Sequence, residues 1–238
     1  MNKTVLSTGD STWKNLYTIG GAAALLQLVS IVSYSVILAV LGSKPASAAE
    51  YFAIHQSSPL AAILRSDFLL LFLVGGYFGT FPALYLSLRK VSPAAAMFAT
   101  LFTFVAVTVC FATESTFALR YLAEKYALAA TEAQRAQLLA AGEAAIASDL
   151  WNSSGAYVSG LLMQGGGIII SLVMLRSKDF SKVTAVAGLL GNAFDLTQHL
   201  LHPWAPSISA PIQMLMGPFY LVWFPMLARD FFRLAKKG

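Results

Sequence analysis

The chain has 238 residues, of which 57% are hydrophobic and only 11% charged, and its formal net charge at pH 7 is +5. A soluble domain carries about 25% charged residues, so this composition excludes an ordinary soluble domain and indicates a multi-pass protein in a lipid bilayer. The basic residues are scattered beside the ends of apolar runs, which argues against nucleic acid as a partner, and the one cysteine excludes an intramolecular disulfide.

Six apolar runs in the chain are long enough to form membrane-spanning helices. Ser58-Pro59 and Ser92-Pro93 mark the starts of the second and third runs, because serine caps helices and proline is tolerated in the first helical turn. Between the first and second runs we expect a loop. The predicted spans cover residues 13–41, 59–88, 94–121, 151–175, 183–202 and 211–227.

Residues 131–150, between the third and fourth spans, are too polar to cross a membrane. The sequence Thr131-Glu132-Ala133-Gln134 matches a capping box, in which two side chains satisfy the first backbone amides of a helix. Apolar residues recur after it at helical spacing. We therefore predict an amphipathic helix that lies on the membrane or over the bundle.

Lysine and arginine residues predict the orientation, because they are enriched in cytoplasmic loops. Of the 16 basic residues, eleven fall on the side that holds both termini and five on the other side. With six spans, both termini are predicted to be cytoplasmic and residues 131–150 to be extracytoplasmic. The expected architecture is all-α: one transmembrane bundle that comprises residues 1–238.

Four predicted spans carry a polar side chain at a similar depth. At about 1.5 Å per residue from the nearest cytoplasmic charge, Gln27, Tyr77, Gln164 and Asp195 lie about 18–20 Å into a hydrocarbon core roughly 30 Å thick, and Asn192 lies at about 15 Å. If these groups face one another, they line an outward-facing pocket, although each could also simply hydrogen-bond a neighbouring helix. The polar residues nearer the outer side are Ser30, Ser33, Tyr34, Glu114, His199 and His202.

The fifth span has the densest set of polar residues. Asp195, His199 and His202 are spaced i, i+4 and i+7, which places them on one helix face. A charge inside a membrane costs about 3 kcal/mol or more, so we expect this face to point inward. The same residues, completed by Glu114, could bind a transition metal, and histidine ligation of a haem is a weaker alternative. His202 precedes Pro203, a position biased away from helical conformation, which leaves its direction open.

Two charged residues open the second span. We expect Asp67 to favour the helix N-terminus and Arg65 to extend its charged end to the membrane surface. The alternative is that Arg65 or Arg120 pairs with Asp195 or Glu114 at the mouth of the pocket.

The order of the six spans and three local stretches resemble a bacterial membrane family known as domain of unknown function 4386. The layout covers nearly the whole chain, and the resemblance implies a helical fold in a bacterial inner membrane with no assigned activity. Glu114 matches a family tendency, whereas Asp195, His199 and His202 match no family pattern. The stretches are Asp149-Leu150-Trp151, Val173-Met174-Leu175-Arg176-Ser177 with Gly188-Leu189-Leu190-Gly191, and Pro211-Ile212-Gln213-Met214.

Three functions are compatible with these residues. The first is a pocket protein that binds or transports a small amphipathic molecule or lipid. The second is a metal-dependent membrane enzyme, a hydrolase or isomerase that uses Asp195 and His199. The third is a structural or accessory subunit in which the polar layer only joins helices. The residues predicted to bind ligand in the first case are Gln27, Tyr34, Tyr77, Glu114, Gln164, Asn192, Asp195 and His199.

Overall fold

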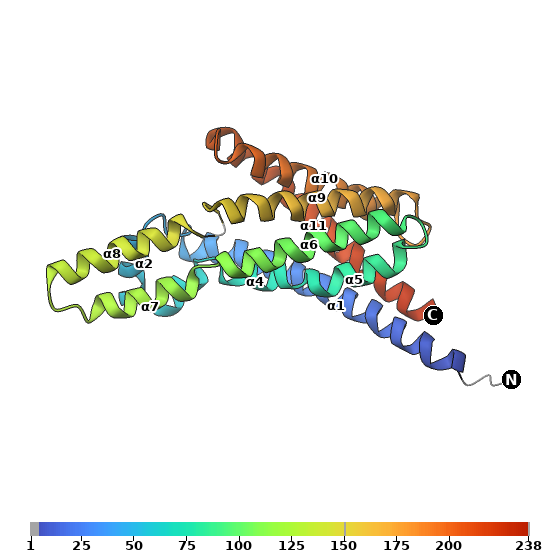
Figure 1. The fold of residues 1–238 in the computed structure, drawn as a ribbon, viewed down its shortest axis with the longest axis horizontal. Helices are drawn as coiled ribbons and strands as arrows, with labels where there is room; N and C mark the ends of the chain where they lie inside the picture. The colour runs from blue at the N-terminus through green and yellow to red at the C-terminus, as the bar shows by residue number, and fades with distance from the viewer. Residues whose placement is uncertain (1–4, 150, 238) are drawn as a thin grey trace. The chain divides into compact units, whose positions relative to one another are not determined.

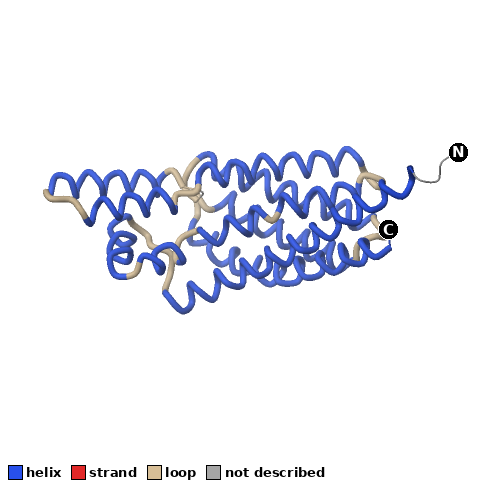
Figure 2. The backbone as a smooth tube through the Cα atoms, turned by 90° about the horizontal axis from the view of Figure 1, so that it is seen from below, coloured by secondary structure: helices blue, strands red, loops and turns tan. Residues whose placement is uncertain are grey.

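The computed structural model describes residues 5–149 and 151–237, and every regular element within them is an α-helix (Figures 1 and 2). This confirms the predicted all-α fold class. In chain order the helices are α1 (Val5–Leu41), α2 (Ala48–Ser57), α3 (Pro59–Leu64), α4 (Phe68–Gly75), α5 (Tyr77–Leu88), α6 (Pro93–Thr113), α7 (Thr116–Ala127), α8 (Glu132–Ala147), α9 (Ser154–Arg176), α10 (Lys182–Leu201) and α11 (Pro206–Lys237).

Among the described residues, five helical stretches are long and apolar enough to cross a membrane. They correspond to five of the six predicted spans. Their length and apolar composition indicate a membrane location for this chain. The predicted fifth span forms helix α10, of 20 residues, but its polar residues lower its hydropathy and it is not among the five. Six spans therefore remain a prediction. The five stretches are Trp13–Leu41, Phe68–Leu88, Pro93–Ala127, Ser154–Arg176 and Pro206–Lys237.

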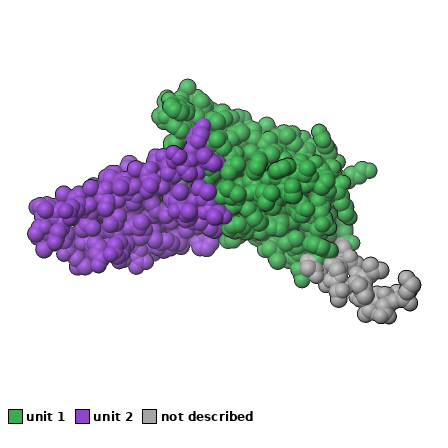
Figure 3. All heavy atoms as spheres, in the orientation of Figure 1, with its two compact units in different colours: residues 1–28, 74–107, 159–238 green, residues 29–73, 108–158 purple. Residues whose placement is uncertain are grey.

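The chain forms two compact units (Figure 3). Unit 1 comprises residues 1–28, 74–107 and 159–238, and unit 2 comprises residues 29–73 and 108–158. The prediction of one bundle over the whole chain stays a prediction, and each unit is considered by itself below.

Unit 1 is a helical bundle built from parts of α1, α6 and α9 together with α5, α10 and α11. The first described turn of α1, the last turn of α11 and the α5–α6 and α9–α10 connections lie at the same end of this unit (Figure 1). At that end the guanidinium of Arg89 lies 5.5 Å from the ring centroid of Trp13. Large side chains of α11, including Trp223, Phe224 and Phe231, are almost completely buried in the bundle.

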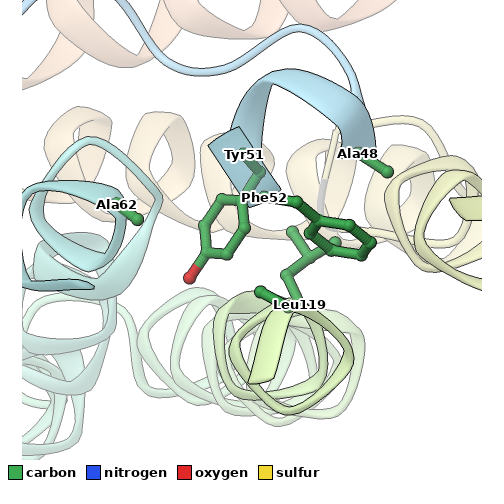
Figure 4. Close-up of a cluster of buried hydrophobic side chains, with 6 residues drawn as sticks. Ala48, Tyr51, Phe52, Ala62 and Leu119 are labelled. Atoms are coloured by element: carbon green, nitrogen blue, oxygen red, sulfur yellow. The ribbon is translucent and has the colours of Figure 1, made fainter. Parts of the chain in front are cut away.

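Unit 2 contains a small hydrophobic core of its own (Figure 4). Tyr51 and Phe52 of α2 are each 1% exposed and pack with Leu119 of α7, and side chains of α8 join the cluster. A Cβ atom at Gly142 of α8 would lie 2.6 Å from the Cβ of Ala48, so α8 crosses α2 at close range. Burial raises the pKa of Tyr51 to about 12, which keeps this phenol neutral at physiological pH.

The predicted amphipathic helix exists as α8, and its start is confirmed. The Thr131 hydroxyl accepts from the Gln134 amide and the Gln134 side chain accepts from the Thr131 amide, so the capping box is complete. The apolar residues Leu139 and Ile146 pack against the core around Phe52.

The expected loop between residues 42 and 58 is wrong, because it contains helix α2. Ser47 is the N-cap residue of α2 and its hydroxyl accepts from the Glu50 amide at 3.2 Å. The sequence signal was present, since Ser47-Ala48-Ala49-Glu50 has the spacing of a capping box.

Two predicted spans are interrupted. The span 59–88 is divided into α3, α4 and α5 by a turn at residues 65–67 and by Gly76, which serves as the N-cap of α5. The span 94–121 ends at Thr113 and continues as α7, after Glu114 accepts a hydrogen bond from the Thr116 amide at 2.8 Å. Polar residues stand at two of these turns, Arg65-Ser66-Asp67 and Glu114-Ser115, but the predicted spans ran through them as continuous helices.

Candidate functional site

The hydroxyl of Tyr220, in α11, is the centre of the polar residues in unit 1. It lies 2.9 Å from Oδ2 of Asp195, 3.1 Å from Oε1 of Gln164 and 3.4 Å from Oδ1 of Asn192. The hydroxyl and the three acceptors are buried, and Asp195 is 7% exposed. Three of the predicted ligand-binding residues are therefore brought together by a fourth residue that the sequence did not single out.

His199 extends this group by one turn of α10. Its Nδ1 atom lies 3.0 Å from Oδ1 of Asp195 and 3.0 Å from the main-chain oxygen of the same residue. The two carboxylate oxygens of Asp195 thus face different partners, His199 on one side and Tyr220 on the other. We call Gln164, Asn192, Asp195, His199 and Tyr220 the Tyr220 cluster.

Helices α9 and α10 bring these residues together through two matched stripes that run antiparallel. A Cβ atom at Gly160 would lie 2.1 Å from Cδ2 of His199, and one at Gly167 would lie 2.0 Å from Oδ1 of Asn192. His199 and Asn192 of α10 therefore each occupy the space beside a glycine of α9, as small residues permit in membrane helices. The stripes are Gly160, Gln164, Gly167 and Ser171 on α9, and Gly188, Asn192, Asp195 and His199 on α10.

The start of α10 is fixed by α11. Ser181 is the N-cap residue, and its hydroxyl accepts from the Thr184 amide at 3.0 Å. Asp230 of α11 is fully buried and accepts from the Ser181 amide at 3.0 Å and from the Thr184 hydroxyl at 2.6 Å. Arg233 forms an ion pair with the same carboxylate at 3.2 Å. This cap fixes where the polar stripe of α10 lies along the bundle.

The other predicted residues of the polar layer divide between the units. Gln27 and Tyr77 are buried in unit 1, at 0% and 5% exposure. Tyr34 and Glu114 belong to unit 2, where the Tyr34 hydroxyl donates to Asp67 at 3.2 Å and Glu114 accepts from the amide at the start of α7.

Asp67 is the centre of a second polar group, in unit 2. Besides Tyr34, the Lys44 ammonium donates to its carboxylate at 2.5 Å and the indole nitrogen of Trp151 donates at 3.1 Å. Lys44 also reaches Asp149 at 3.2 Å. Asp67 and Asp149 are only 4% and 2% exposed. We call these five residues the Lys44 hub.

The prediction for Asp67 was incomplete, and the alternative pairing proposed for Arg65 and Arg120 was wrong. Asp67 opens α4 but also holds Lys44 and Trp151, which the sequence did not connect with it. Arg65 pairs with Glu50 at 3.2 Å and Arg120 with Glu124 at 2.9 Å. These ion pairs contradict the alternative in which either arginine pairs with Asp195 or Glu114.

The geometry offers little to a transition metal. Among the residues whose side chains the structure describes, no group of three or more histidine, cysteine, aspartate or glutamate side chains is placed to hold a metal ion. His202 keeps helical backbone angles, φ −50° and ψ −47°, despite the following proline, and its amide donates to the Gln198 oxygen at 2.8 Å. Around the Tyr220 hydroxyl the site instead supplies three oxygen acceptors, and the one imidazole of the cluster, His199, contacts the other side of Asp195.

Comparison with family models, with curated proteins and with solved structures finds no match for this chain. The resemblance to domain of unknown function 4386 therefore stays a prediction, and the chemistry of the site has to be argued from its own residues.

Proposed function

We propose that this chain is a six-span protein of a bacterial inner membrane and that the Tyr220 cluster is its ligand site. In this proposal the cluster binds a small amphipathic molecule or lipid, which the protein holds or transports. The single observation that carries it is the burial of the Asp195 carboxylate, 7% exposed, among the oxygens of Tyr220, Gln164 and Asn192.

Two features support six spans with both termini in the cytoplasm. Helix α10 connects with its neighbours at opposite ends of unit 1, as a crossing helix must (Figure 1). The end of unit 1 that holds the first described turn of α1 and the last turn of α11 also holds Arg89, Lys90, Arg176 and Lys182, in agreement with the positive-inside rule.

A binding role explains the cluster better than helix association alone. Two helices can be joined by amide and hydroxyl groups, each of which contributes about 0.6–2 kcal/mol in a membrane. An aspartate at this depth costs about 3 kcal/mol or more and is usually retained for function. Helices α9, α10 and α11 also direct their polar groups to one point, which association does not require.

The test compares ligands that remain bound to the purified full-length chain in detergent. We expect native mass spectrometry to detect an organic adduct on the wild-type protein and on Thr197→Ala, whose hydroxyl is exposed on α10. The adduct should be absent from Asp195→Asn, which keeps the size of the side chain but removes its charge.

Two results would contradict the proposal. An adduct retained by Asp195→Asn would place the ligand elsewhere. A wild-type protein without any adduct, together with an Asp195→Asn protein that differs only in its melting temperature, would favour the structural subunit.

A further inference from the structure

The Tyr220 hydroxyl faces more hydrogen-bond acceptors than it has hydrogens to donate. A phenol has one hydrogen, so the Tyr220 hydroxyl can fully donate to only one of the three oxygens within 3.4 Å of it. A buried acceptor without a donor costs about 1–3 kcal/mol. The arrangement therefore favours a further positive partner at this point.

The neighbouring contacts keep these oxygens directed at the same point. The Asn192 amide nitrogen donates to the main-chain oxygen of Gly188 at 2.7 Å, which turns its Oδ1 atom toward Tyr220. His199 contacts the other carboxylate oxygen of Asp195, so Oδ2 is the one that faces the phenol.

The chemistry of the four groups selects the kind of partner. A carboxylate, two amide oxygens and a phenol oxygen are hard ligands, which suit hard cations rather than zinc or copper. With a neutral His199 ring, the cluster has one negative charge, on Asp195, and therefore neutralises one positive charge. A divalent ion would leave a net charge in an apolar bundle, which is costly.

We infer that Oδ2 of Asp195, Oδ1 of Asn192, Oε1 of Gln164 and the Tyr220 hydroxyl oxygen form a binding site for a monovalent alkali cation. This inference rests on the proposed function, since it assigns a cation to the same site. The cation would accompany the organic ligand or neutralise Asp195 while that ligand binds.

The test measures thermal unfolding of the full-length chain in detergent at neutral pH. Lithium, sodium, potassium and choline chlorides are compared at equal ionic strength, so that choline controls for salt. We expect at least one alkali ion to raise the melting temperature of the wild type and of Thr197→Ala in a saturable way. Its apparent affinity should fall about tenfold or more in Asp195→Asn.

A second variant keeps the test informative if Asp195→Asn does not fold. Gln164→Met keeps the length of the side chain and the carboxylate of Asp195 but removes one oxygen ligand, so it should weaken alkali binding less than Asp195→Asn does. The inference is overturned by equal melting in all four salts or by unchanged alkali binding in both variants.

The two proposals fail separately. If the organic adduct is lost in Asp195→Asn but the wild type ignores alkali ions, the cation site is wrong and the proposed function stands. If neither an adduct nor an alkali effect depends on Asp195, both are wrong.

Discussion

At the scale of single residues, the glycines of α9 determine how closely the polar side chains of α10 can approach. His199 lies where a side chain at position 160 would be, with Cδ2 2.1 Å from the Cβ position of Gly160. Gly165, on another face of the same helix, has no atom within 4 Å of its Cβ position among the described residues. The two glycines therefore provide a matched pair.

We expect Gly160→Ala to lower the free energy of unfolding by about 1–3 kcal/mol, because the methyl group displaces the His199 ring from Asp195. Gly165→Ala should instead leave it unchanged or raise it by up to about 1 kcal/mol, because alanine favours a helix more than glycine does. Thermal unfolding of both variants in detergent measures the difference. Equal stability of the two variants would show that His199 does not pack against Gly160.

The sequence predicted individual polar residues but not their partners. Asn192, Asp195 and Gln164 were identified because they interrupt apolar runs. Tyr220 was missed, because nothing in the surrounding residues of its span marks it as a partner of Asp195. Helical periodicity shows which residues share a face, but the rotation of α11 against α10 is set by tertiary packing and is not encoded in spacing.

At the scale of helices, the N-terminus of α10 is held by a carboxylate from α11. Asp230→Ala removes the acceptor of the Ser181 amide and the Thr184 hydroxyl and leaves Arg233 without its ion pair. Because the Ser181 amide loses its acceptor and Arg233 loses its ion pair, we expect a loss of about 1–3 kcal/mol in the free energy of unfolding.

The control for this prediction is Asp179→Ala. Asp179 lies in the α9–α10 connection, close to the N-cap residue Ser181, but the carboxylate that accepts from the cap is that of Asp230. The melting temperature should fall clearly in Asp230→Ala and little in Asp179→Ala. An equal fall in both variants would mean that charge, rather than capping, stabilises this end of α10.

Helix starts were predicted more accurately than helix interruptions. Ser58, Ser92 and Thr131 each carry a local signal, and a helix begins directly after each of them. The interruptions at residues 65–67 and at Gly76 coincide with Arg65-Ser66-Asp67 and with Gly75-Gly76, but these residues also occur inside continuous membrane helices and did not by themselves predict a break. Their positions depend on what each helix packs against.

At the scale of the whole molecule, the number of crossings is the main prediction to test. In a chain with Cys110→Ala, single cysteines at Lys14, Gln137 and Lys236 can be labelled with a membrane-impermeant maleimide. With six crossings, Gln137→Cys should react in intact spheroplasts, whereas the other two should react only after the membrane is opened.

This labelling pattern depends directly on α10. If α10 does not cross the membrane, the chain crosses five times and Lys14 and Lys236 lie on opposite sides. Labelling of one but not the other in intact spheroplasts would therefore contradict both the six-span topology and the membrane depth assigned to Asp195.

The Lys44 hub has a consequence for how the chain is made. Asp149 follows Lys44 by 105 residues and Trp151 follows Asp67 by 84 residues, so the ribosome completes α8 before the hub can close. With a single cysteine, this chain cannot lock a loop covalently. The ion pairs and hydrogen bonds of the Lys44 hub join distant parts of the chain reversibly, where a disulfide would join them covalently. We expect these contacts to form among the last steps of folding of unit 2.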